Sequence, residues 1–155
     1  MEELLDLVVV RDCAPARFAA LEGGLLAGMA APDARPTLLV AELAGDAVLL
    51  GRHQRASSAL SLSAVEDAGL VVARRLGGGR AVRVGAGTLG VALAVPSTGA
   101  LLPAPVGPAK VINRYVRGLL AGLSLVSGTT PVHYFGRDFL SSGGRRIGLV
   151  SQDGA

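Results

Sequence analysis

Runs of apolar and β-branched residues, separated by polar or glycine-containing segments, predict a series of short strands. The runs lie at Leu4–Val10, Thr37–Leu43, Ala47–Leu50, Leu70–Ala73 and Thr88–Val95. Ala44-Gly45-Asp46 separates the second run from the third and predicts that these two strands form a hairpin. Ser142-Gly143-Gly144 has the composition of a turn, so a second hairpin is expected from Arg137–Ser141 and Arg145–Ser151.

Apolar residues at three- and four-residue spacing predict helices between these strands. One stripe is formed by Phe18, Leu21, Leu25 and Met29. Asp12 is expected to cap this helix, with Pro15 in its first turn, where a missing N–H group costs nothing. A short helix is predicted at Ser63–Ala68, and the clearest amphipathic helix spans Lys110–Leu123.

The length of 155 residues predicts one domain over residues 1–155, because this is close to the commonest domain size. Hydrophobic residues make up 50% of the chain and charged residues 17%, which favours a buried globular interior. The longest apolar runs have about eight residues, so no membrane span is expected. The chain begins with Met1 and two acidic residues, unlike a secretory signal, and a cytoplasmic location is expected.

Charge is distributed unevenly along the chain. Residues 1–67 carry ten acidic and five basic side chains, a net charge of −5. Residues 68–137 contain no acid and eight basic side chains, which predicts an anionic ligand or partner for this part of the chain. The single cysteine, Cys13, allows no internal disulfide, and with only two histidines no metal site is predicted.

Two common nucleotide-binding motifs are excluded by their context. Gly85-Ala86-Gly87-Thr88-Leu89-Gly90 has the three glycines of a dinucleotide-binding loop but is followed by a predicted strand instead of a helix. The only lysine, Lys110, is followed by Val111, so no Walker-type phosphate loop occurs. No Gly-x-Ser-x-Gly nucleophile elbow is present.

A loop rich in glycine and arginine lies between two predicted strands, at residues 73–82. Its three glycines allow the backbone to approach a ligand closely, and Arg74, Arg75, Arg80 and Arg83 supply charge for a carboxylate or phosphate. The alternative interpretation is a mobile hairpin tip with solvated arginines. Composition alone does not separate these two interpretations.

Four motifs in order resemble those of lipoate-protein ligases, octanoyltransferases and biotin ligases. Arg74-Arg75-Leu76-Gly77-Gly78-Gly79-Arg80-Ala81-Val82 is similar to the acyl-adenylate loop of lipoate-protein ligases. The other three motifs are Ala20-Leu21-Glu22 with Leu25-Leu26, Leu50-Gly51-Arg52-His53-Gln54, and Gly144-Arg145-Arg146-Ile147-Gly148 with Ser151-Gln152.

The resemblance implies an α/β fold with a mixed, largely antiparallel sheet flanked by helices. It also implies binding of a lipoyl, octanoyl or biotinyl adenylate, made from ATP, with Mg²⁺ as a companion of the nucleotide, and transfer of the acyl group to a lysine of a carrier domain. The implied adenylate-binding residues are Arg74, Arg75, Gly77, Gly78, Gly79, Arg80 and Ala81, with a second loop at Arg52 and Gln54. Val71, Val72 and Leu93 are expected to form an apolar floor for an alkyl chain.

The sequence also departs from the family pattern. Gly77 stands where the family usually has Ser or Thr, and Val84-Gly85 stands where a His-Asp pair often follows the loop. The active-site lysine of the family falls at Arg146, whose planar guanidinium is not interchangeable with an ammonium group. Cys13 is far from the position of the octanoyltransferase nucleophile. The family's further sheet and accessory domain are not expected within residues 1–155, so either a second subunit completes the fold or the protein is shortened.

Three functions therefore remain open. The first is a ligase-like enzyme with weak or partner-dependent catalysis, and the second is an inactive module that binds an acyl cofactor or an acylated carrier protein. The third is nucleic-acid binding through the basic segment, which the low aromatic content of 3% and the absence of tryptophan disfavour because few stacking platforms are available.

Overall fold

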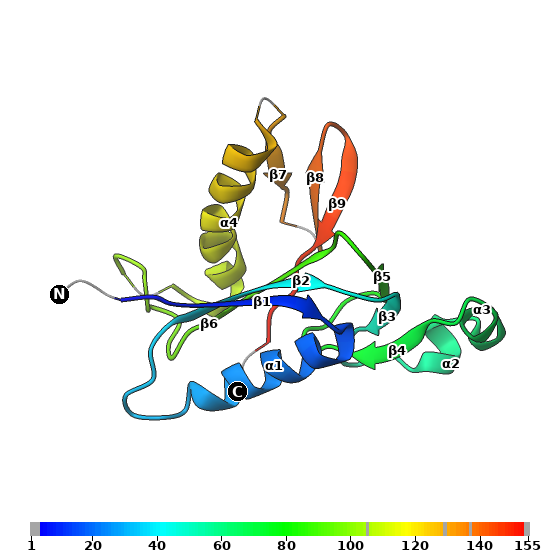
Figure 1. Cartoon of the computed structure of the whole chain (residues 1–155). Coiled ribbons are helices and arrows are strands. Elements are labelled where there is room, and N and C mark those ends of the chain that lie inside the picture. Colours follow the sequence, from blue (N-terminus) through cyan, green and yellow to red (C-terminus); the bar gives the residue numbers. More distant parts are fainter. Residues whose placement is uncertain (1–3, 105, 129, 137, 154–155) are drawn as a thin grey trace.

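The computed structural model describes residues 4–104, 106–128, 130–136 and 138–153. These residues form three three-stranded sheets, with strand orders β1-β2-β6, β4-β3-β5 and β7-β8-β9 (Figure 1). The prediction of an α/β fold with mixed and antiparallel sheets flanked by helices is confirmed. Arg137, the first residue of one predicted strand, lies outside the described residues.

The first sheet is built around a β-α-β unit. β1 (Asp6–Cys13) and β2 (Thr37–Leu43) pair in parallel, connected by α1 (Pro15–Gly28), and β6 (Leu89–Ala94) pairs antiparallel with β2. Pro15 opens α1 as predicted, but the prediction that Asp12 caps it is wrong. Asp12 is part of β1 with a φ of 49°, and the capping position is taken by Ala14, whose side chain cannot cap.

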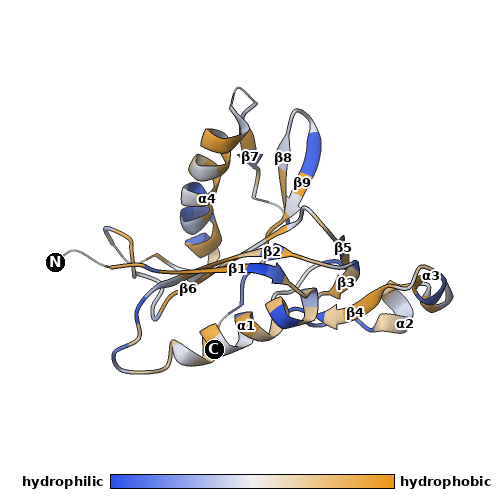
Figure 2. Cartoon of the chain, viewed as in Figure 1, coloured by the Kyte–Doolittle hydropathy of each residue, from blue (hydrophilic) through white to orange (hydrophobic). Residues whose placement is uncertain are grey.

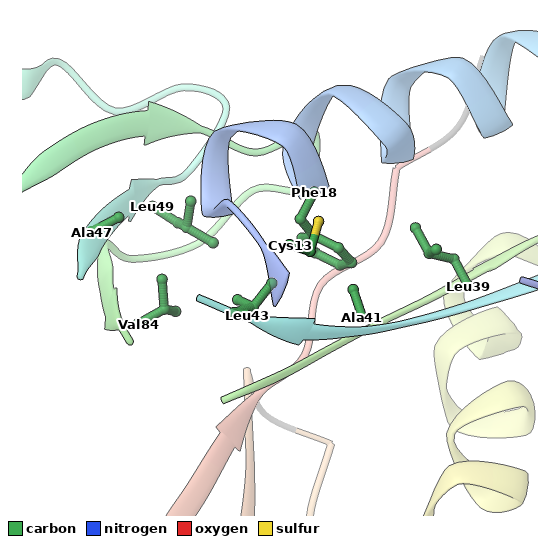
Figure 3. Packing of buried hydrophobic residues seen from close by; sticks show 8 residues of the cluster. All are labelled: Cys13, Phe18, Leu39, Ala41, Leu43, Ala47, Leu49 and Val84. Atoms are coloured by element: carbon green, nitrogen blue, oxygen red, sulfur yellow. The ribbon is translucent and has the colours of Figure 1, made fainter. Parts of the chain in front are cut away.

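The main core lies between α1 and the first two sheets. Figure 3 shows the side chains of Cys13 and Phe18 packed against Leu39, Ala41 and Leu43 of β2. The Phe18 ring also lies against β6 so closely that a Cβ added at Gly90 would be 2.6 Å from it. Burial of each large apolar side chain contributes roughly 1.5–3 kcal/mol, so this core fixes α1 against the sheet.

The second sheet contains the two strands that flank the glycine-rich loop, one before it and one after it in the sequence. β3 (Ala47–Leu50) pairs in parallel with β4 (Val71–Arg74) and antiparallel with β5 (Val82–Val84). Two short helices, α2 (Ala56–Ala59) and α3 (Leu62–Asp67), connect β3 to β4. The predicted hairpin of β2 with β3 is wrong, because the Ala44–Asp46 link passes the chain from the first sheet to the second.

The third sheet is antiparallel and packs against the longest helix. η1 (Pro108–Lys110) leads into α4 (Val111–Ser127), and the sheet contains β7 (Val132–Tyr134), β8 (Phe139–Ser142) and β9 (Arg145–Leu149). The hairpin of β8 with β9 confirms the turn predicted at Gly143-Gly144. Val116, Val132 and Leu140 form a second, smaller core.

In Figure 1, α1 lies along one side of the first sheet, and α4 with β7–β9 rises from the other side. Within the described ranges, α1, α4 and the shorter helices all fall below the combination of length and hydrophobicity that a membrane span requires.

One face of the first sheet carries exposed apolar side chains. Because residues two apart in a strand share a face, the register places on it Leu7, Val9, Leu38, Val40, Val91 and Leu93. Leu7 is 62% exposed and Val9 61% exposed. Figure 2 shows the hydrophobic character of these strands, which contrasts with the hydrophilic residues at the start of β9.

Candidate functional site

Arg74 joins the two loops in which the sequence predicts site residues. Its Nη1 donates to the carbonyl oxygens of Gly51 at 2.8 Å, Arg52 at 3.1 Å and Gln54 at 2.8 Å. The Gln54 side chain closes the same turn, because its Oε1 accepts a hydrogen bond of 3.0 Å from the Gly51 N–H group. We call residues 51–54 the Gln54 loop. The end of β4 thus holds this loop against the second sheet.

Arg75 organises the next segment from the inside. Its guanidinium is buried, with 6% of the residue exposed, and donates to the carbonyls of Leu49 at 3.0 Å, Gly78 at 2.7 Å and Arg80 at 2.7 Å. We call residues 77–80 the glycine loop. Arg75 therefore fixes the curvature of the glycine loop by binding its carbonyl groups, a role that composition alone does not indicate.

These hydrogen bonds determine where the amide groups of the glycine loop point. Every peptide bond described is trans, so a carbonyl oxygen and the following N–H group lie on opposite sides of the chain. The Gly77 carbonyl accepts from Arg52 N–H at 3.0 Å and the Gly78 carbonyl accepts from Arg75, so the N–H groups of Gly78 and Gly79 are turned away from these partners. Neither N–H group donates to any residue that the structure describes.

Close backbone contact requires glycine at position 51, and the backbone conformation favours it at position 79. A Cβ added at Gly51 would overlap with the carbonyl oxygen of Gly79, so the Gln54 loop and the glycine loop touch through their backbones. Gly79 itself has a φ of 90°, a conformation that residues with a side chain rarely adopt. Gly78 is different, because a Cβ added there would meet no described atom within 4 Å.

Acidic groups flank the buried guanidinium of Arg75. Burial raises the pKa of Glu22 on α1 from 4.5 to about 7, and the positive charge of Arg75 partly opposes this rise. Burial lowers the pKa of Arg75, while the charges of Glu22 and Asp138 raise it. Asp138, next to β8, also lies 3.6 Å from the Nε atom of Arg80. The ion pair of Arg80 with Asp138 thereby connects the glycine loop to the third sheet.

The segment after β9 contacts both loops. The Arg52 guanidinium forms an ion pair with the Asp153 carboxylate. A Cβ added at Gly77 would overlap with the hydroxyl of Ser151, so this side chain occupies the space next to Gly77. Val150 N–H donates to the Asp138 carbonyl at 2.9 Å and anchors the start of the segment.

Arg146, which the sequence motif predicts to stand at the position of the family's lysine, is exposed on β9. Its Cζ atom is 4.5 Å from the centre of the Phe139 ring on the neighbouring strand, a cation–π contact. Among the other predicted site residues, Arg80 is exposed and Ala81 is half-buried at the end of the glycine loop. The structure therefore places Arg146 on a different sheet from the glycine loop.

Two further expectations concern apolar residues and the cysteine. Val71 and Val72 are successive residues of β4 and point to opposite faces, so they do not form one floor. Leu93 lies in the first sheet, separate from both. Cys13 is completely buried and donates through its thiol to the Ala14 carbonyl at 3.7 Å.

The sequence profile of the lipoyl protein ligase A/B catalytic domain matches residues 14–147, which include both loops and Arg146. The chain belongs to this family. The resemblance found in the four motifs is thereby confirmed. No curated protein sequence matches the chain.

Solved structures of lipoate-protein ligases share the fold. LipL1 of P. falciparum in complex with lipoate has a TM-score of 0.72 at 16% identity, over 92% of this chain and 42% of that one. Lipoate-protein ligase A bound with ATP has a TM-score of 0.69 at 17% identity, over 95% and 59%. A bi-partite lipoate protein ligase from Thermoplasma acidophilum, analysed with its E2 lipoyl domain, has a TM-score of 0.70 at 14% identity, over 94% and 54%. This ligase-family chain thus spans about half the length of these structures.

Sequence reasoning did not assign site roles to Glu22, Asp138, Ser151 and Asp153 of this ligase-family chain. Glu22 and Ser151 fall within the motifs that carry the family resemblance, but these motifs do not reveal that Glu22 interacts electrostatically with Arg75 or that Ser151 contacts Gly77. Asp138 and Asp153 are the only acids after residue 67, and each faces an arginine of one loop. Two isolated acids in a basic part of the sequence were the signal from which ion pairs with the loop arginines could have been predicted.

Proposed function

We propose that this chain is a lipoate-protein ligase-like domain over residues 1–155 that binds an acyl adenylate at the glycine loop. The acyl group is lipoyl, octanoyl or biotinyl, and its acceptor is a lysine of a lipoyl or biotinyl carrier domain. The family match supports the ligase class. The lipoate and ATP in two of the structural neighbours favour lipoate and ATP as the substrates.

The observation that carries this proposal is the orientation of the Gly78 and Gly79 amides. Successive N–H groups of a glycine-rich turn that have no partner within the protein are the donors of an anion-binding nest, which suits the phosphate of an adenylate. Arg52 N–H binds the Gly77 carbonyl and Arg75 binds the Gly78 carbonyl, so the orientation of the N–H group that follows each carbonyl is fixed before a ligand binds. A preformed set of donors binds more tightly because little ordering is required.

The proposed chemistry has two steps. The carboxylate oxygen of the acyl group attacks the α-phosphorus of ATP and pyrophosphate leaves, with Mg²⁺ carried on the nucleotide phosphates. The carrier lysine then attacks the acyl carbonyl carbon, AMP leaves, and the amine loses a proton. The Gly78 and Gly79 amides stabilise the adenylate phosphate in both steps.

Arg146 is the proposed catalytic cation, and it limits the rate of acyl transfer. Its charge is delocalised over a planar group that stacks on Phe139 at 4.5 Å, whereas an ammonium group would act as a compact point charge. The transfer step in this chain is therefore expected to be slow, or to depend on a partner that moves Arg146 from Phe139.

The proposal includes a second polypeptide that covers the apolar face of the first sheet formed by β1, β2 and β6. Exposed side chains such as Leu7 and Val9 favour this, because large exposed apolar patches mark interaction sites. The description of one structural neighbour as bi-partite offers a precedent for a ligase in two pieces.

Turnover separates this function from the alternatives. The purified chain is incubated with ATP, lipoate and a lipoyl carrier domain, and acylation is followed as a mass increase of the carrier. An inactive binding module would bind the adenylate without a mass increase, in the presence or absence of added partner. Nucleic-acid binding through the basic segment would show a steep loss of affinity with salt.

A further inference from the structure

The hydroxyl of Ser151 lies where the side chain of residue 77 would begin. Gly77 is buried, and a Cβ added to it would overlap with the Oγ of Ser151 and lie 2.6 Å from its Cβ. The two residues are far apart in the sequence, on the glycine loop and on the segment after β9. The contact is therefore a product of the tertiary fold.

Two anchors hold Ser151 at this place. On one side, Val150 N–H donates to the Asp138 carbonyl at 2.9 Å. On the other side, Asp153 forms an ion pair with Arg52 of the Gln54 loop, and the Arg52 N–H group donates to the Gly77 carbonyl at 3.0 Å. The same residue, Arg52, thus binds both the segment that carries Ser151 and the residue that Ser151 covers.

We propose that Ser151 is a ligand-binding residue of the glycine loop, and that its hydroxyl donates to the anionic group held by the Gly78 and Gly79 amides. A hydroxyl can rotate to donate to a phosphate or carboxylate oxygen, and a charge-assisted bond of this kind is stronger than a neutral one. Residue 77 is glycine because the Ser151 hydroxyl, which comes from the segment after β9, occupies the space that a side chain at position 77 would fill. This inference rests on the proposed function, since it names a further residue of the same site.

The test compares variants that distinguish an effect of the Ser151 hydroxyl on binding from an effect on folding. Binding of lipoyl adenylate is titrated calorimetrically for Ser151→Ala, Ser151→Thr, Gly77→Ser and the double variant Gly77→Ser with Ser151→Gly. Ser151→Ala is expected to bind about tenfold more weakly, as loss of one charge-assisted hydrogen bond implies, and Ser151→Thr within about twofold of wild type. Ser151 is exposed, so neither change should shift the thermal unfolding midpoint.

The swap tests the geometry independently. Gly77→Ser alone places two side chains in one space and should weaken binding and lower the unfolding midpoint, while the added Ser151→Gly should restore both. Wild-type affinity in Ser151→Ala would overturn the proposed role. If the wild-type chain binds no adenylate, the proposed function fails and Ser151 loses its ligand role with it. Recovery of the unfolding midpoint in the double variant would then still establish the contact between residues 77 and 151.

Discussion

The carboxylate of Glu22 on α1 and the guanidinium of Arg75 beside the glycine loop influence each other electrostatically, and each has a buried polar atom without a hydrogen bond in the described part of the chain. Glu22 Oε2 and Arg75 Nε are buried and have no hydrogen-bond partner among the described residues. Buried polar atoms without partners are costly, so the protonation state of Glu22 affects the stability of this region. Asp138 is the second acid that interacts with Arg75.

The Glu22→Gln variant is expected to be less sensitive to pH than the wild type. The pKa of Glu22 is raised by burial from 4.5 to about 7, so the folded state binds the proton more tightly than the unfolded state does. This contribution to stability is complete below pH 4.5 and is lost as the pH rises through about 7. The free energy of unfolding of the wild type should fall by about 2–3 kcal/mol more than that of the variant between pH 5 and pH 8.

Urea unfolding of both proteins across this pH range measures the difference. Glu22→Asp is the matched control, because it keeps the titrating group. Parallel pH profiles for wild type and Glu22→Gln would show that Glu22 does not titrate in this range.

The Arg75→Met variant is expected to lose about 3–5 kcal/mol of stability. The change removes the buried donor of three backbone carbonyls. It also removes the positive charge that interacts with Glu22 and Asp138. The control is Arg83→Gln, which removes only the exposed ion pair of 3.3 Å with Asp46 and should cost less than about 1 kcal/mol. Chemical denaturation measures both, and equal losses would contradict the organising role of Arg75.

Gly51→Ala is expected to separate the two loops. The added methyl group overlaps with the Gly79 carbonyl oxygen, and relief of such overpacking costs about 1–3 kcal/mol. Gly78→Ala is its matched control, since the added Cβ meets nothing described within 4 Å. The free energy of unfolding should fall in Gly51→Ala alone, and an unchanged value in that variant would show that the two backbones are not in contact.

Under the proposed function, Arg146→Lys is expected to raise the rate of acyl transfer to a carrier domain by about tenfold or more, because a compact ammonium replaces a stacked guanidinium at the proposed catalytic position. Its control is Arg145→Lys, the same change one residue away on β9. The rate is read from the mass increase of the carrier over time. A rate in Arg146→Lys no higher than in Arg145→Lys would remove Arg146 as the limiting group.

The local pattern predicted most elements but not their pairing. The apolar runs at Thr37–Leu43 and Ala47–Leu50 match β2 and β3 residue for residue, since a continuous run ended by polar residues marks a buried strand. The turn between them also suits a hairpin, yet each strand finds different neighbours, and sheet pairing is a tertiary property. β5 and β7 were not predicted, because three residues are too few to establish a period.

The candidate site was predicted in position but not in detail. Its glycines and arginines were recognised from the family-like motif, whereas the structure uses Arg74 and Arg75 to bind backbone carbonyls of the loops. A guanidinium with five donors serves either purpose, so residue type alone does not decide between them. The contact of Ser151 with Gly77 depends on chain segments far apart in sequence and was beyond any local pattern.

The most direct test is calorimetric titration of the purified chain with lipoyl, octanoyl and biotinyl adenylates. One adenylate should bind at a single site in the wild type and in Gly118→Ala, a control on the exposed face of α4. Gly78→Val should bind at least about tenfold more weakly with an unchanged unfolding midpoint, because the side chain enters open space beside the Gly78 and Gly79 amides. Failure of all three adenylates to bind the wild type, or equal binding by Gly78→Val, would contradict the glycine loop as the acyl-adenylate site.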